Sequence, residues 1–267
     1  MKFFDSHAHY FEQKFNQLEG GAHALLTSPE FTDSVSGVVN VGTNPDTNRR
    51  CIEQTALYDF MWCAVGIHPH DCQHLERTPD EVLEELYNLV RDPESRRRDK
   101  IVAIGEIGYD YYWPPADKTI QSEYFARQLD MARELDLPVI IHDREAHADS
   151  LEMVKQYPGV RGVFHCYSGS DEMAKEFLKL GWYLSFGGPV TYKNAEKVRR
   201  AASVVPLERL LLETDCPYLT PHPHRGKINH SGRLNLIAEM QAELHDVAIE
   251  QLAAVTEHNV RTLFNIQ

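Results

Sequence analysis

The stretch PVIIHDREAHADSLEMVKQYPGVRGVFHCYSGSDEMAKEFLKLGWYLSFG, residues 138–187, alternates short apolar runs with longer segments of helical periodicity. The runs at 138–143, 162–167 and 183–187 are rich in apolar, β-branched and aromatic residues, which is typical of strands. Apolar residues recur at helical spacing in the segments between them, 146–156 and 171–180. This order predicts successive βα units, which build a parallel sheet.

The same alternation continues on both sides of this stretch. Further strands are expected at 3–9, 37–42, 62–68, 101–108 and 210–215, and further helices at 47–58, 78–91, 120–135, 195–204, 235–244 and 249–264. Eight βα units in 267 residues fit an α/β fold of one (β/α)8 TIM-like barrel. An open doubly wound sheet would also need a Gly-rich dinucleotide turn, and neither G-x-G-x-x-G nor G-x-x-x-x-G-K-[ST] occurs. We therefore expect residues 1–267 to form a single domain, with a polar loop at 92–100.

Composition and charge exclude several classes of protein. The hydrophobic share of 42% and the charged share of 25% are ordinary for globular proteins. No apolar run approaches the ~20 residues of a membrane helix, and no signal-peptide pattern opens the sequence, so we expect a soluble, cytoplasmic protein with no membrane partner. Five scattered cysteines without a C-x-x-C pair indicate reduced thiols. A formal charge of −13 argues against broad binding to a nucleic-acid backbone, although bound divalent cations can invert the local field for a phosphate substrate.

Metal-binding side chains recur at the ends of the expected strands, which is where TIM barrels carry their active sites. Six of the eight strands contribute to this set, with His7 and His9, His68, Glu106, His142, His165 and Asp215. His7 and His9 are two residues apart, so in a strand they point to the same face and both can reach one ion. A single H-x-H pair is weak evidence for a metal site. Metal-binding residue types at several strand ends in succession are stronger evidence, and together they predict a metal centre. The same parity turns Cys166 and Cys216 away from it.

Six motifs occur in order along the chain: DSHAH (5–9), GIHPH (66–70), GEIGYDY (105–111), IHDR (141–144), FHCYSG (164–169) and ETDCPYL (213–219). Together they resemble the motifs of the TatD family of metal-dependent deoxyribonucleases, within the amidohydrolase superfamily. The resemblance implies two divalent ions, Mg, Mn or Zn. It implies that His7, His9 and Asp215 hold one ion, that His142 and His165 hold the other, and that Glu106 bridges the two.

Candidate substrate contacts are less specific. The loop TPHPHRGKINH (220–230) follows the eighth strand, where TIM barrels often bind phosphate, so Arg225 could clamp a phosphoryl oxygen and Lys227 could add charge. The family commonly continues RGKRNEP where this chain has RGKINHS. Tyr111 lies in an aromatic run, 109–113, that offers faces for stacking a base or, alternatively, packs in the core. His68 is either a ligand, a substrate contact or a packing residue, and Asp5 and Glu213 are placed to orient ligands.

These observations predict metal-assisted hydrolysis of phosphodiester bonds, with nucleotides released from DNA ends and with Glu106 and Asp215 as the catalytic carboxylates. The alternative is an ester, lactone or amide substrate, such as an aminoacyl-tRNA ester, because the same centre can direct hydroxide at carbon. A non-catalytic binding subunit would be expected to have lost ligands, and all six are present. No organic cofactor is expected.

Overall fold

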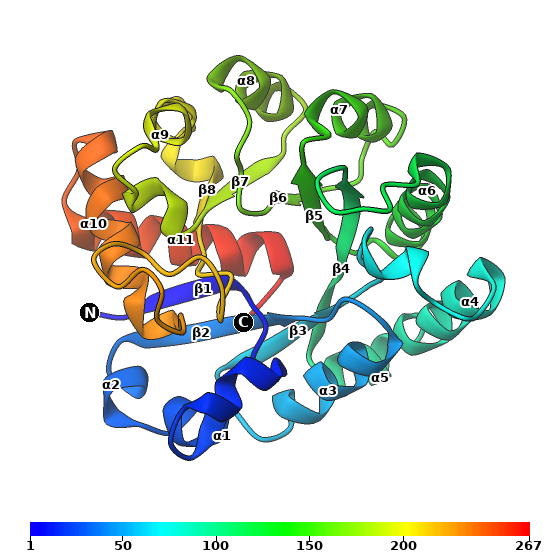
Figure 1. Cartoon of the computed structure of the whole chain (residues 1–267), viewed down its shortest axis with the longest axis horizontal. Coiled ribbons are helices and arrows are strands. Elements are labelled where there is room, and N and C mark those ends of the chain that lie inside the picture. The colour runs from blue at the N-terminus through cyan, green and yellow to red at the C-terminus, as the bar shows by residue number, and fades with distance from the viewer.

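A computed structural model describes residues 1–267. Eight parallel strands follow one another around a barrel in chain order, and helices surround them (Figure 1). The strands are β1 (Phe3–Ala8), β2 (Val35–Val41), β3 (Met61–Val65), β4 (Ile101–Asp110), β5 (Val139–Arg144), β6 (Gly162–Phe164), β7 (Tyr183–Phe186) and β8 (Leu210–Leu212). The predicted TIM-like barrel is confirmed.

The barrel closes between its first and last strands. Ala8 forms a parallel bridge with Cys216, the backbone N–H of His9 donates to Cys216 O at 2.8 Å, and that of Asp215 donates to His7 O at 3.0 Å. These contacts lie where β1 ends and just beyond β8. Closure therefore brings His7, His9 and Asp215 together although they are separated by about two hundred positions in the sequence.

The helices begin at sequence signals that satisfy their free backbone N–H groups. Asn44 and Thr78 both form capping boxes, with Thr47 and Glu81 respectively. The α-helices are α1 (Gly21–Leu26), α2 (Pro29–Thr32), α3 (Pro45–Thr55), α4 (Pro79–Val90), α5 (Pro93–Arg98), α6 (Lys118–Leu135), α7 (His147–Lys155), α8 (Asp171–Lys179), α9 (Glu196–Ser203), α10 (Leu234–His245) and α11 (Ile249–Phe264). Short 3-10 helices are η1 (Gln13–Gln17), η2 (Asp71–Gln73), η3 (Gly188–Thr191), η4 (Leu207–Arg209) and η5 (Ser231–Arg233).

The prediction of a loop at 92–100 is wrong, because α5 lies there. Asp92 accepts a hydrogen bond from the backbone N–H of Ser95, Pro93 occupies the first turn, and arginines fill the last turn, where they complement the helix dipole. These start and stop signals outweigh the high charge of the segment.

Several strands are shorter than their apolar runs. His68, His165 and Asp215 lie in loops just beyond β3, β6 and β8. Cys166 and Asp215 have φ of 43° and 55°, a left-handed conformation that a strand cannot contain. The parity argument that turns Cys166 and Cys216 away from the metal centre therefore starts from a wrong premise. Neither cysteine belongs to a metal-binding group in the structure, and Cys216 packs in an apolar cluster.

Apolar packing fills one end of the barrel. Phe4, Val39, Ile140 and Leu211 point inward there, in one cluster with residues of α11 such as Phe264. A larger apolar cluster lies between the strands and the surrounding helices. The opposite end, where the strands finish, therefore keeps an interior free for polar side chains. None of the helices is both long and apolar enough to cross a membrane.

Two glycines, Gly66 just after β3 and Gly105 in β4, let the two segments approach each other closely next to Glu106. A Cβ atom on Gly66 would lie 2.6 Å from the carbonyl carbon of Gly105, which is a backbone atom that cannot move aside easily. Glu106 donates its backbone N–H to Gly42 O at 3.0 Å in the same region. The position of Glu106 thus depends on the absence of a side chain at Gly66.

We predict that Gly66→Ala lowers the free energy of unfolding by about 1–3 kcal/mol, the usual cost of forcing an extra carbon into a packed interior. Chemical denaturation measures the change. Gly187→Ala is the matched control, because its Cβ would lie no closer than 3.4 Å to any atom and its φ is −111°. An equal loss of stability in both variants would contradict the steric explanation.

Candidate metal centre

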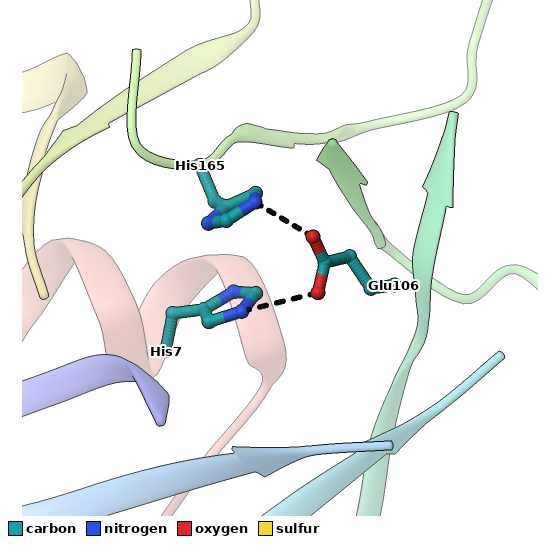
Figure 2. A group of neighbouring side chains, drawn as sticks. All are labelled: His7, Glu106 and His165. Atoms are coloured by element: carbon teal, nitrogen blue, oxygen red, sulfur yellow. Dashed lines mark ion pairs between the residues drawn. The ribbon is translucent and has the colours of Figure 1, made fainter. Parts of the chain in front are cut away.

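Glu106, on the inner side of β4, is the central residue of the site. Its side chain is 3% exposed, and its two oxygens face different histidines. Oε1 lies 2.7 Å from His142 Nδ1 and 2.8 Å from His165 Nε2, whereas Oε2 lies 3.4 Å from His7 Nε2 and 3.7 Å from His9 Nε2. Figure 2 shows the carboxylate reaching between His165 and His7. One side chain therefore joins two sets of potential ligands.

The histidine nitrogens converge on these oxygens. His7 Nε2 and His9 Nε2 are 3.0 Å apart, and Asp215 Oδ1 lies 3.2 Å from His9 Nε2. On the other side, His142 Nδ1 and His165 Nε2 are 3.2 Å apart. The rings of His7 and His165 stack at 3.9 Å. We call these six side chains the Glu106 cluster; its members are His7, His9, Glu106, His142, His165 and Asp215.

Two of the histidines, His9 and His142, have partners on their second ring nitrogens of the kind that orient metal-binding histidines. His9 Nδ1 donates to Val41 O at 2.7 Å, and His142 Nε2 donates to Asp110 Oδ2 at 3.0 Å. These bonds leave His9 Nε2 and His142 Nδ1 facing the cluster. His7 Nδ1 is buried without a partner.

The donor set of the cluster fits divalent cations. It combines imidazole nitrogens, which suit zinc, with carboxylate oxygens, which also suit magnesium and manganese. Three groups have ligand atoms within 4.8 Å of one another: His7, Glu106 and His165; His7, His9 and Asp215; and His68, Asp110 and His142.

The electrostatics of the cluster favour ionised carboxylates. Burial opposes ionisation of Glu106, but the charges of His165, His68 and His7 outweigh it and hold the Glu106 pKa well below its usual range. Burial also opposes ionisation of Asp110, yet its hydrogen bond with His142 lowers the Asp110 pKa to about 2. Ionised carboxylates that are buried together in this way suit the binding of cations.

Asp5 and Glu213 support the loops that carry the ligands. Asp5 accepts hydrogen bonds from the backbone N–H of Thr214 at 2.9 Å and from Ser231 Oγ at 2.6 Å. Glu213 Oε1 accepts the N–H of Cys166 at 2.7 Å. Asp5 thereby fixes the segment before Asp215, and Glu213 fixes the turn after His165.

Asp110 is a functional residue that sequence reasoning missed. Its Oδ2 holds His142, while its Oδ1 accepts the backbone N–H groups of Tyr112 at 2.9 Å and Trp113 at 3.1 Å. A carboxylate four residues after Glu106 on one strand lies on the same face of that strand. That spacing was the available signal.

His68 reaches the Glu106 cluster. Its Nδ1 accepts the backbone N–H of His70 at 3.0 Å, so a neutral His68 ring carries its proton on Nε2. That Nε2 lies 3.5 Å from Glu106 Oε1. His68 thus presents an N–H donor to the site.

The other three candidate substrate residues lie outside this group. Tyr111 donates its hydroxyl to Asp149 at 2.7 Å, and its ring lies 4.1 Å from Lys118 Nζ. Arg225 packs on the ring of Tyr192 at 4.2 Å and lines a separate cavity of about 580 Å³. Lys227 is exposed in the same loop.

A cavity of about 430 Å³ opens over the Glu106 cluster, and we call it the central cavity. Its wall includes His68, Trp113, Arg144 and Tyr218 as well as every member of the cluster except His7. A larger cavity of about 570 Å³, which Lys100 and Arg161 help to line, includes residues at the starts of β4 and β5. Lys100 and Arg161 already have partners within the protein: Lys100 donates to backbone carbonyls, and Arg161 pairs with Asp136.

Residues 4–265 match the family model described as TatD related DNase. The chain belongs to the TatD family. It is 40% identical over 265 residues to the uncharacterized metal-dependent hydrolase YabD of Bacillus subtilis, covering 98% of this chain and 99% of that one. It is 37% identical to the uncharacterized metal-dependent hydrolase YcfH of Escherichia coli, covering 98% and 95% of the two chains. The crystal structure of YjjV, a TatD homolog from Escherichia coli, superposes with a TM-score of 0.88 at 29% identity over 99% and 98%.

These comparisons identify the chain as a TatD-family metal-dependent hydrolase, and they agree with the candidate metal-binding groups in supporting use of a divalent metal. A phosphotriesterase homology protein from Escherichia coli, with phosphate in its active site, superposes with a TM-score of 0.64 at 15% identity. At this sequence identity the likeness shows a shared fold and gives no information about the substrate of this chain.

We predict that Asp110→Asn weakens binding of divalent metal by about 10- to 100-fold, because the variant changes the partner that orients His142. Titration of the metal-free protein with Zn²⁺ or Mn²⁺ measures the affinity. Asp143→Asn is the matched control, since Asp143 Oδ2 holds His147 Nδ1 at 2.7 Å outside the Glu106 cluster. Equal affinities in Asp110→Asn and the parent would remove Asp110 from the metal centre.

Proposed function

We propose that this TatD-family hydrolase cleaves phosphodiester bonds in DNA and releases nucleotides from an end. The observation that carries the proposal is the placement of Glu106, whose two oxygens face two histidine groups at 2.7–3.7 Å. In this proposal His7, His9 and Asp215 hold one divalent ion, His142 and His165 hold a second, and Glu106 holds both. Magnesium, manganese and zinc all suit this donor set.

Bound ions of this kind lower the pKa of a water molecule and neutralise charge on a phosphoryl oxygen. The protein supplies the remaining functions. Asp215 is the more open of the two cluster carboxylates, 15% exposed against 3% for Glu106. Asp215 is therefore the group that can accept a proton from the attacking water and pass it to solvent. His68 directs its Nε2–H toward the same space and can donate to a phosphoryl oxygen.

The separate cavity lined by Arg225 also suits phosphate groups of a nucleic-acid backbone. Arg225 lines a cavity with Lys193 and His222, and no acidic residue contributes to its wall. In a chain of formal charge −13, such a cavity is a local exception that favours anions. We propose that Arg225, with Lys227 from the same loop, contacts phosphates away from the scissile bond.

We predict that the purified protein shortens end-labelled single-stranded DNA, that chelation abolishes this activity, and that Mg²⁺, Mn²⁺ or Zn²⁺ restores it. An aminoacyl ester is assayed in parallel, because a dinuclear centre of this type can also attack a carbonyl carbon. Hydrolysis of the aminoacyl ester with no cleavage of DNA would replace the phosphodiester proposal. Full activity in a verified metal-free sample would overturn the metal-assisted reaction.

We predict that Asp215→Asn lowers turnover by roughly 10²-fold or more, the scale of general acid–base catalysis. The amide keeps a ligating oxygen but loses the negative charge and the basic site, so most of the metal should stay bound. Metal content and turnover are measured on one sample. Asp136→Asn, at an exposed residue beyond α6, is the control. Turnover near the parent value with metal bound would show that another group accepts the proton.

A further inference from the structure

Two exposed aromatic side chains lie next to each other just after β4, and one of them lines the central cavity. Tyr112 and Trp113 follow β4 and are 47% and 51% exposed, which is unusual for rings of this size. Their centroids lie 4.9 Å apart and their planes are perpendicular. Trp113 lines the central cavity together with His142 and Glu106. Trp113 therefore offers an apolar face beside the metal centre, and Tyr112 packs against it.

Arg144 packs against both rings. It ends β5, two residues after His142, and its guanidinium carbon lies 4.0 Å from the centroid of Tyr112 and 5.6 Å from that of Trp113. It forms no ion pair, although the chain has 40 acidic residues, and it lines the central cavity. An arginine held in place by stacking and free of carboxylates keeps its donors available for an anion of the substrate.

One buried carboxylate fixes this group relative to the metal centre. Asp110 is 2% exposed, accepts the backbone N–H groups of Tyr112 and Trp113 at Oδ1, and holds His142 at Oδ2. Asp110 also pairs in register with Arg144 across β4 and β5. The aromatic rings, the arginine and a histidine of the Glu106 cluster are thus positioned by the same pair of strands.

We propose that Tyr112, Trp113 and Arg144 form a subsite for the nucleotide next to the scissile phosphate. This proposal rests on the proposed function and specifies it. Arg144, held against the ring of Tyr112, binds the phosphate of that nucleotide through its N–H donors, and the exposed face of Trp113 stacks on its base.

The test compares two substrates in Trp113→Ala and Arg144→Ala. One is a single-stranded DNA decamer, and the other is bis(p-nitrophenyl) phosphate, a diester without a neighbouring nucleotide. The ratio of kcat/KM for the decamer to kcat/KM for the small diester should fall about 10-fold or more in each variant, the scale of one lost stacking or charged contact. Arg209→Ala is the matched control, because Arg209 packs on Tyr183 at 4.8 Å just before β8. An unchanged ratio in both variants would overturn the proposal.

A binding measurement separates this proposal from the proposed function. A phosphorothioate oligothymidylate should quench tryptophan fluorescence of the metal-loaded parent at Trp113. Trp182 is buried, Trp62 lines the cavity near the start of β4, and Trp113 is the tryptophan that lines the central cavity. The quenching should disappear in Trp113→Phe and need at least about fivefold more oligonucleotide in Arg144→Ala. Quenching without DNA cleavage by the parent would support the subsite and reject the reaction. DNA cleavage with no quenching would support the reaction and overturn the subsite.

Discussion

The structure depends on the burial of one ionised carboxylate. Glu106 is 3% exposed and lies among five imidazole rings, those of His7, His9, His68, His142 and His165, with Asp110 and Asp215 close by. Burying a carboxylate is expensive unless partners of opposite charge surround it. The barrel supplies imidazole nitrogens, which can carry that charge or hold a cation that does, from β1, β5 and the loops after β1, β3 and β6. The site therefore forms only when these strands come together.

One end of the barrel is packed with apolar side chains that stabilise the fold, and the other end carries the candidate metal centre. Inward apolar residues and α11 fill the end where the strands begin, so that end needs no polar partner. At the other end the strands finish in histidines and carboxylates whose hydrogen bonds run between elements, such as Asp5 to Thr214 and Asp110 to His142. The apolar end can therefore compensate for the cost of the polar end, and the polar end remains open to a substrate.

Much of this arrangement could be predicted from the sequence, because strand and helix periods differ and parallel strands must end on one side. The barrel and the convergence of His7, His9, Glu106, His142, His165 and Asp215 follow from that regularity. The ends of β6 and β8 could not be predicted, since they depend on left-handed conformations at Cys166 and Asp215. The partners of Asp110 and Tyr111 depend on the register of β4 with β5 and on α7, which side-chain spacing alone does not give.

We propose that Glu106 joins two metal sites, and the number of bound ions decides whether it does. Metal-free parent, Glu106→Ala, His142→Ala and the control His147→Ala are each titrated with Zn²⁺ or Mn²⁺, and stoichiometry and affinity are measured by calorimetry. We expect two ions in the parent and the control, one tightly bound ion in His142→Ala, and weakened binding at both sites in Glu106→Ala. Two ions bound to Glu106→Ala with the affinities of the parent would contradict it.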